Sequence, residues 1–179
     1  NMPSDMKARI AREFAELART KSIDKITVKD IVEACHITRQ TFYYHFQDLI
    51  DVIDWSLRQA MEELVEKSIR IDSREQVIEL FLSEAVKARG LLRKLLASQL
   101  REQTERLIVE SVRSYFREMV ERRELLQDVS RSDAQVALDF YTFATVGMML
   151  EYCSRPNLDV KRLAGQITRL MSGDALEKR

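Results

Sequence analysis

The sequence predicts an all-α protein with a three-helix, helix-turn-helix domain over residues 1–47 and a helical second domain over residues 48–179. Apolar residues recur at helical spacing along the chain, whose 179 residues include only four Gly and two Pro. This composition favours long helices. No linker rich in Pro, Gly or Ser separates the two domains, so we expect one long helix to be shared between them.

The first predicted helix carries an apolar stripe at Ile10, Phe14, Leu17 and Ala18. This spacing puts the four side chains on one face of an amphipathic helix. We expect that face to brace the two helices that follow.

Two short helices joined by a turn are predicted between Ile26 and Phe46. Thr27 is suited to cap the first, which runs roughly to Ala34, and Thr38 is suited to cap the second. The intervening turn is Cys35 to Ile37. On the second helix Phe42 and Phe46 are four residues apart and are predicted to face the core together with Ile37.

The remaining side chains of the second helix are polar or aromatic and are left outside: Thr38, Arg39, Gln40, Thr41, Tyr43, Tyr44 and His45. Arg and Gln form paired hydrogen bonds to purine edges, and the other groups suit phosphate oxygens. This surface favours contact with the DNA major groove. The alternative is a solvated helix face in an ordinary helical bundle.

These residues resemble the DNA-binding domain of TetR-type (TetR/AcrR) transcriptional regulators. The positions that fall on the family pattern are Thr27, Ile31, Ile37, Thr38, Thr41, Phe42, Tyr43, His45 and Phe46. The resemblance implies that Lys29, Arg39 and Gln40 lie near base edges. It also implies that Thr27, Thr41, Tyr43, Tyr44 and His45 lie at or near the phosphate backbone.

The sequence departs from the family pattern at two places. His36 stands at the turn position usually held by Gly, so a positive φ there would cost strain, although His tolerates that region better than most residues. After Phe46 the family usually has a phosphate-binding Lys, whereas this chain reads Gln47, Asp48 and Leu49.

The second domain is predicted to begin with a helix from Leu49 to about Asp72, followed by a helix capped by Ser73. A third apolar group follows Gly90, and a long arginine-rich helix comes next. The segment from Ser132 to Cys153 is apolar on nearly all sides, which requires burial all round.

We expect that segment and the closing helix to form a homodimer interface about a two-fold axis, as TetR-type regulators do. The alternative is a central core helix in a monomer.

Candidates for an effector pocket in the second domain are its aromatic and Met side chains. They are Trp55, Phe81, Tyr115, Phe116, Phe140, Tyr141, Met148 and Tyr152. The stretch from Tyr43 to Trp55 also resembles the dihydroxyacetone kinase regulator subgroup of the family, which keeps open a protein effector in place of a small molecule.

Other classes of function find little support in the sequence. Cys35 and Cys153 are far apart, which argues against a disulfide or zinc framework, and both His residues lie inside the predicted DNA-facing segment. We therefore expect no enzyme activity, cofactor or metal. The sequence has no apolar run approaching the roughly 20 residues that span a bilayer and no leader pattern, which predicts a cytoplasmic protein.

The prediction is a sequence-specific, homodimeric transcriptional regulator that binds a palindromic site in double-stranded DNA. We expect a repressor released by a small molecule; the alternatives are a DNA-binding co-activator with a protein partner and a helical interaction module without a DNA target. The formal net charge is zero, and basic residues are in slight excess over residues 1–47. We therefore expect modest affinity per subunit, raised by pairing two subunits.

Overall fold

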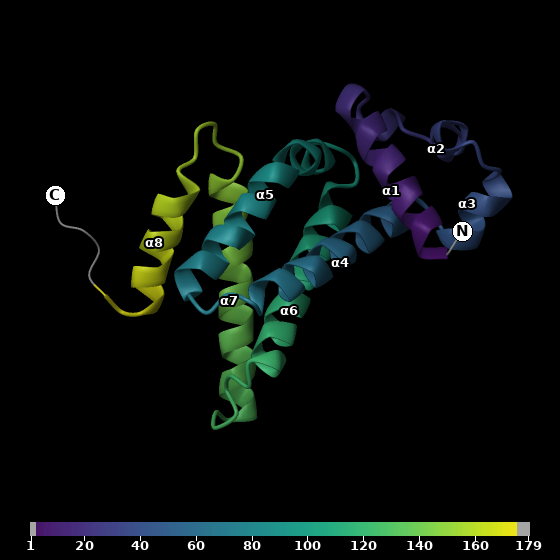
Figure 1. Cartoon of the computed structure of the whole chain (residues 1–179). Helices are drawn as coiled ribbons and strands as arrows, with labels where there is room; N and C mark the ends of the chain where they lie inside the picture. Colours follow the sequence, from purple (N-terminus) through teal and green to yellow (C-terminus); the bar gives the residue numbers. More distant parts are fainter. Residues whose placement is uncertain (1–2, 175–179) are drawn as a thin grey trace. The chain divides into compact units, whose positions relative to one another are not determined.

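The computed structural model describes residues 3–174, where eight α-helices and one short 3-10 helix are joined by turns without any β-strand (Figure 1). The all-α prediction is confirmed. Residues 1–2, at the start of the first predicted domain, and residues 175–179, at the end of the second, lie outside the described part.

The chain forms two compact units. The first unit holds the residues up to Ala60 together with Gly90–Ser111, and the second holds Met61–Arg89 together with the residues from Val112 onward. Helices α4 (Leu49–Ser68), α5 (Arg74–Leu96) and α6 (Arg101–Arg122) therefore each contribute to both units. The functional domain boundary after Gln47 stays a prediction.

The first unit is built on α1 (Pro3–Thr20), a 3-10 turn (Ile23–Lys25), α2 (Val28–Cys35) and α3 (Arg39–His45). These elements bury one apolar cluster, and the stripe predicted on α1 belongs to it. Its members include Ile10, Phe14, Ala18, Ile31, Phe42, Phe46 and Val52, with Leu17 and Ile37 partly buried against them. The predicted core of the helix-turn-helix is therefore confirmed.

The corner between α5 and α6 is also part of the first unit. Leu95 is buried in its core, Lys94 Nζ donates to the carbonyl oxygen of Ala18, and the Gln99 N–H donates to Asp24 Oδ1 at 3.0 Å. These bonds satisfy a carbonyl at the end of α1 and an amide at the α5–α6 turn.

In the second unit, a polar cluster ends α4. The hydroxyls of Ser68 and Tyr115 lie 2.9 Å apart, and the Arg123 guanidinium donates to the carbonyl oxygens of Ser68 and Ile71. Helix α4 ends at Ser68 rather than near Asp72 as predicted, because these terminal carbonyls are satisfied by a side chain from the end of α6.

Helix α5 is continuous through Gly90, where the sequence suggested the start of a separate apolar group. A single helical glycine costs about 1 kcal/mol relative to alanine, which does not end a helix of 23 residues. The group after Gly90 is therefore the last part of α5.

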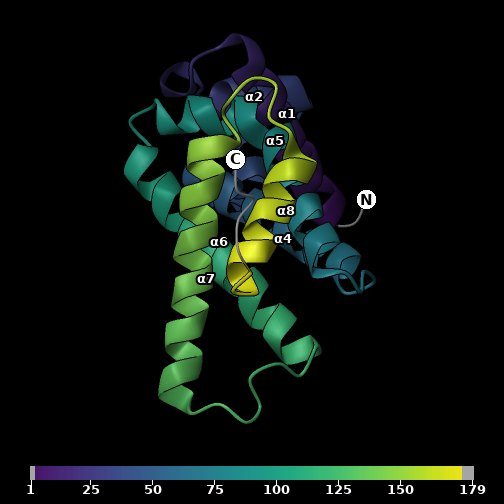
Figure 2. The ribbon, with the colours of Figure 1, turned by 90° about the vertical axis from the view of Figure 1, so that its left-hand side faces the viewer.

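Helices α7 (Arg131–Tyr152) and α8 (Val160–Met171) run in opposite directions (Figures 1 and 2). On α7, Thr142, Val146 and Met149 are buried within the chain. The other face of α7 is exposed and apolar, and α8 adds two exposed apolar residues at its C-terminal end. These five exposed residues, together called here the α7–α8 face, are Val136, Phe140 and Phe143 on α7 and Leu170 and Met171 on α8.

Candidate nucleic-acid interface

Helix α2 begins with a reciprocal cap between Thr27 and Asp30. Thr27 Oγ1 accepts a hydrogen bond from the Asp30 N–H, while Asp30 Oδ2 accepts from the Thr27 N–H at 2.8 Å and from the Thr27 hydroxyl. Lys21 Nζ also donates to Asp30 Oδ2, at 2.8 Å. The Lys21 hydrogen bond, followed by those from Thr27, holds the pKa of Asp30 at about 2.

The turn between α2 and α3 uses a left-handed residue, as anticipated. His36 has φ 51° and ψ 44°, and the Ile37 N–H donates to the Val32 carbonyl oxygen at 3.0 Å. This is the usual way of closing a helix with one αL residue, although the residue is most often glycine. The sharp reversal sets the start of α3.

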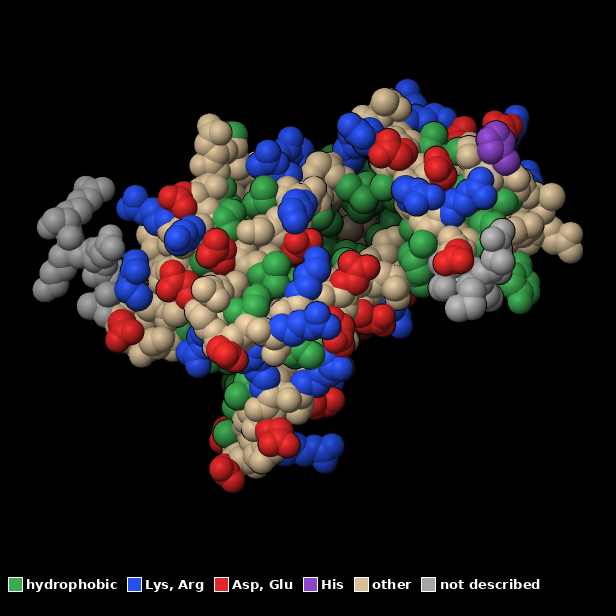
Figure 3. Space-filling view, in the orientation of Figure 1, with side chains coloured by type: hydrophobic (Ala, Val, Ile, Leu, Met, Phe, Trp, Pro, Cys, Tyr) green, Lys and Arg blue, Asp and Glu red, His purple; other side chains and the backbone are tan. Residues whose placement is uncertain are grey.

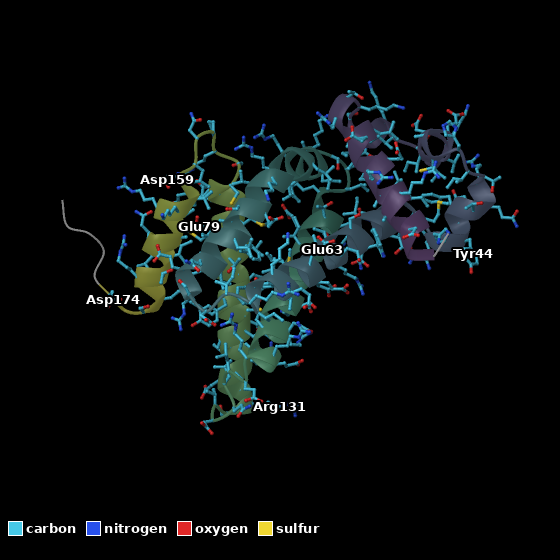
Figure 4. The ribbon with its side chains drawn as sticks, viewed as in Figure 1. Tyr44, Glu63, Glu79, Arg131, Asp159 and Asp174 are labelled. Carbon is cyan, nitrogen blue, oxygen red and sulfur yellow. The ribbon has the colours of Figure 1, made fainter. Side chains whose placement is uncertain are left out.

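Helix α3 is anchored on one side and exposed on the other. Thr38 caps it by accepting from the Thr41 N–H at 3.0 Å, and Phe42 is fully buried. Tyr44 is 81% exposed and projects outward from the helix (Figure 4). Tyr43 is 52% exposed, with its ring edge-on to that of Phe42 at 5.3 Å.

The other predicted DNA-contacting residues are accessible to differing degrees. Thr38, Arg39 and Gln40 are exposed at the start of α3, whereas Thr41 and His45 are half-buried. Thr27 and Lys29 are exposed at the start of α2, where Lys29 Nζ lies 3.8 Å from Glu33 Oε1. The structure thus leaves polar and aromatic groups accessible on a short, anchored helix, and their contact with DNA stays a prediction.

Lys21 and Asp30, which fix the start of α2, were not among the residues predicted from the sequence. The Thr27 to Asp30 spacing is that of a capping box and could have indicated Asp30. Lys21 lies nine residues from Asp30 and on a different element, so no local pattern marks it.

Five of the predicted effector-pocket residues form a continuous chain of ring contacts in the second unit. Centroid distances of 5.3–6.2 Å link Phe81, Tyr115, Phe116, Tyr141 and Phe140 in that order. Phe81 and Tyr115 are buried, whereas Phe140 is exposed.

The remaining three pocket candidates lie apart from this chain. Trp55 is in the first unit, with its ring 6.1 Å from that of Phe46. Met148 is half-buried, and the ring of Tyr152 lies 4.1 Å from the Arg155 guanidinium.

An open groove of about 680 Å³ lies in the second unit, mainly along α5, and contains none of the predicted pocket residues. Its lining residues are Ile71, Ser73, Glu75, Gln76, Glu79, Leu80, Ser83, Glu84, Lys87 and Lys161.

Basic and acidic side chains are interspersed over the face seen in Figure 3. Within residues 3–174 no group of His, Cys, Asp or Glu side chains is placed to hold a metal ion. No helix in the described part of the chain combines the length and apolarity that crossing a membrane requires.

The fold and the exposed, capped helix define a helix-turn-helix protein. Residues 14–48 match the family described as bacterial regulatory proteins, tetR family. The match covers about a fifth of the chain, and the chain as a whole has the fold of solved TetR-family regulators.

Relatives and solved structures agree with this assignment. The chain is 34% identical over 56 residues to the HTH-type dhaKLM operon transcriptional activator DhaS of Lactococcus lactis, a match covering 31% of this chain and 30% of that protein. The structure of a dihydroxyacetone kinase operon activator DhaS has a TM-score of 0.68 at 20% identity, covering 93% of this chain and 94% of its own.

The TetR family repressor AlkX from Dietzia, described as implicated in biodegradation of n-alkanes, has a TM-score of 0.63 at 16% identity, covering 92% and 94% of the two chains. These proteins are described as activators or a repressor of transcription.

Proposed function

We propose that this protein is a sequence-specific, DNA-binding transcriptional regulator. The main support is the arrangement of α3, where buried Phe42 anchors the helix and Arg39, Gln40 and Tyr44 stay exposed. Arg39 and Gln40, with Lys29, read base edges in the major groove. The hydroxyl and imidazole groups of Thr38, Thr41, Tyr43, Tyr44 and His45 contact the DNA phosphate backbone. Thr27 joins them only when its hydroxyl releases the hydrogen bond that it donates to Asp30.

Selection of bound sequences from a random DNA pool tests this proposal, and a two-fold symmetric motif is the expected result. On that motif, Arg39→Ala removes a base contact and lowers discrimination at one position by about 1–3 kcal/mol. Tyr43→Phe keeps the ring but removes a phosphate contact, so it weakens binding equally on all sequences. The matched control is Arg117→Ala on α6, which leaves binding unchanged.

The proposal fails if the purified protein, at low salt and without effector, prefers no duplex over heparin. An equal loss on all sequences for Arg39→Ala would contradict its base-reading role.

The protein is further proposed to act as a homodimer through the α7–α8 face. The exposed fractions of Val136, Phe140 and Phe143 are 65%, 66% and 56% in the single chain. Contiguous exposed apolar residues mark interaction surfaces, and a second copy about a two-fold axis matches a palindromic DNA site.

Phe140→Glu combined with Phe143→Glu is expected to give a monomer by light scattering. Leu125→Glu, an exposed apolar position outside the face, is the control and keeps the dimer. A wild-type mass that stays monomeric at all concentrations would contradict the dimer.

For regulation we propose a repressor that releases DNA when a small molecule binds the second unit. The ring chain from Phe81 to Phe140 is its candidate site. The alternative is an activator whose second unit responds to a protein partner. The observation that supports this alternative is the match to DhaS, which is described as an activator. Apolar compounds that raise the melting temperature and release DNA would support the repressor.

A further inference from the structure

The start of α4, directly after the proposed recognition helix, is occupied by the chain's own carboxylates. The Asp51 N–H donates to Asp48 Oδ1 and the Gln47 N–H donates to Asp51 Oδ2, both at 2.9 Å. Free N–H groups at a helix start bind phosphate well, but here two of them are satisfied internally and negative charge stands beside them. This helix start is therefore poorly suited to a DNA phosphate.

A cation reaches this junction from α1 instead. Lys7 Nζ lies 5.1 Å from the centroid of the ring of Phe46, the residue that directly follows α3 as its C-cap. Lys7 belongs to the same helix face as Ile10 and Phe14, three and seven residues further on, and both of these are buried in the core of the first unit. The position of the Lys7 side chain thus follows from the way α1 packs.

Two further features hold the Lys7 ammonium in place and leave it available to an anion. Phe46 is buried, and its ring contacts those of Phe42 and Trp55 with a centroid distance of 6.1 Å in each case, so the platform under the ammonium is fixed. Within residues 3–174, Lys7 forms no ion pair with a carboxylate. An ammonium over a ring face keeps N–H groups that can point away from the ring.

We infer that Lys7 binds a phosphate of the DNA strand bordering the groove that α3 enters. The inference rests on the proposed function and adds one residue to its DNA contacts. Lys7 supplies, from α1, the positive charge that the start of α4 lacks. As a point charge on phosphate it contributes affinity without sequence preference.

The test measures duplex affinity as a function of KCl concentration for the full chain and for Lys7→Gln. Each phosphate contact contributes about 0.9 to the magnitude of the slope of log K against log salt concentration. A dimer places one Lys7 from each subunit on the DNA, so Lys7→Gln is expected to reduce the magnitude of the slope by about 1.8. By the same relation, affinity at 0.1 M salt falls about eightfold per contact, equally on selected and scrambled duplexes.

Three variants separate a phosphate contact from a packing role. Lys7→Arg keeps the charge and is expected to keep the slope. Gln47→Lys, added to Lys7→Gln, is expected to restore the slope, because the Gln47 side chain is exposed and forms no hydrogen bond within the described residues. Lys87→Gln removes an exposed ammonium from α5 and leaves the slope unchanged.

The inference is overturned if wild type binds DNA with a steep salt dependence and Lys7→Gln has the same slope and affinity. It is also overturned if the slope falls but neither Lys7→Arg keeps it nor Gln47→Lys restores it, since Lys7 then acts through packing. Thermal unfolding of each variant shows that it is folded. Absence of wild-type DNA binding is a separate result, which removes the proposed function itself.

Discussion

His36→Gly is expected to stabilise the protein. A left-handed conformation costs an L-residue about 1–2 kcal/mol, and His lies at the tolerant end of that range. The His36 side chain is exposed and makes no hydrogen bond or ring contact in the described part of the chain, so its removal loses little. Glycine's extra freedom in the unfolded chain costs about 0.4–1 kcal/mol. With a strain cost near 1 kcal/mol for His, the net gain is roughly 0–0.6 kcal/mol.

The assay is thermal unfolding followed by circular dichroism, with His36→Ala as the matched control. For a chain of this size a gain of 1 kcal/mol raises the melting temperature by about 2–4 °C, so the glycine variant should melt up to about 2 °C higher. His36→Ala keeps a Cβ atom at the left-handed position, so its melting temperature should not rise. Hydrogen exchange at the Ile37 amide, which is bonded to Val32, reports locally and should slow only with glycine. Equal shifts for both variants would refute the strain argument.

Three other outcomes follow from the same contacts. The folded-state pKa of Asp30, about 2, is below its unfolded value of about 3.9, so its contribution to stability is present above pH 4 and is lost as the pH falls toward 2. Asp30→Asn should therefore make the urea concentration at the unfolding midpoint depend less on pH between 4 and 2. The same pH dependence in Asp30→Asn and wild type would contradict this. Burial raises the pKa values of the Cys35 and Cys153 thiols, so iodoacetamide at pH 8 should label them only after unfolding, as read by mass. Tyr115→Phe strands the buried Ser68 hydroxyl and should cost about 1–3 kcal/mol in urea unfolding; adding Ser68→Ala should recover part of the loss, and a strictly additive pair would argue against the bond.

The helix-turn-helix could be predicted from sequence because its signals are local. Thr27 and Thr38 cap helices within three residues of themselves, and the αL turn at His36 was anticipated from the resemblance to the family pattern, which usually has Gly there. Each of these features depends on backbone groups close in sequence, so the pattern of residue types was sufficient.

The features that were missed depend on residues far apart in the chain. The end of α4 is set by Arg123, more than 50 residues after Ser68. Trp55 was assigned to the effector pocket because it is a large apolar residue after Gln47, yet it packs on Phe46 in the first unit. Periodicity shows that such a side chain is buried but not which cluster buries it.

Helix α7 shows how sequence and structure together favour one oligomeric state. The sequence required burial on nearly all sides, which a monomer core helix or a dimer helix would both satisfy. Within the chain, Val146 and Met149 are buried while Phe140 and Phe143 stay more than half exposed. A monomer core helix would bury both faces, and the cost of leaving two phenylalanines in water is about 1.5–3 kcal/mol each. The proposed second copy over the α7–α8 face would remove that cost, which is why a dimer is proposed in place of a monomer core helix.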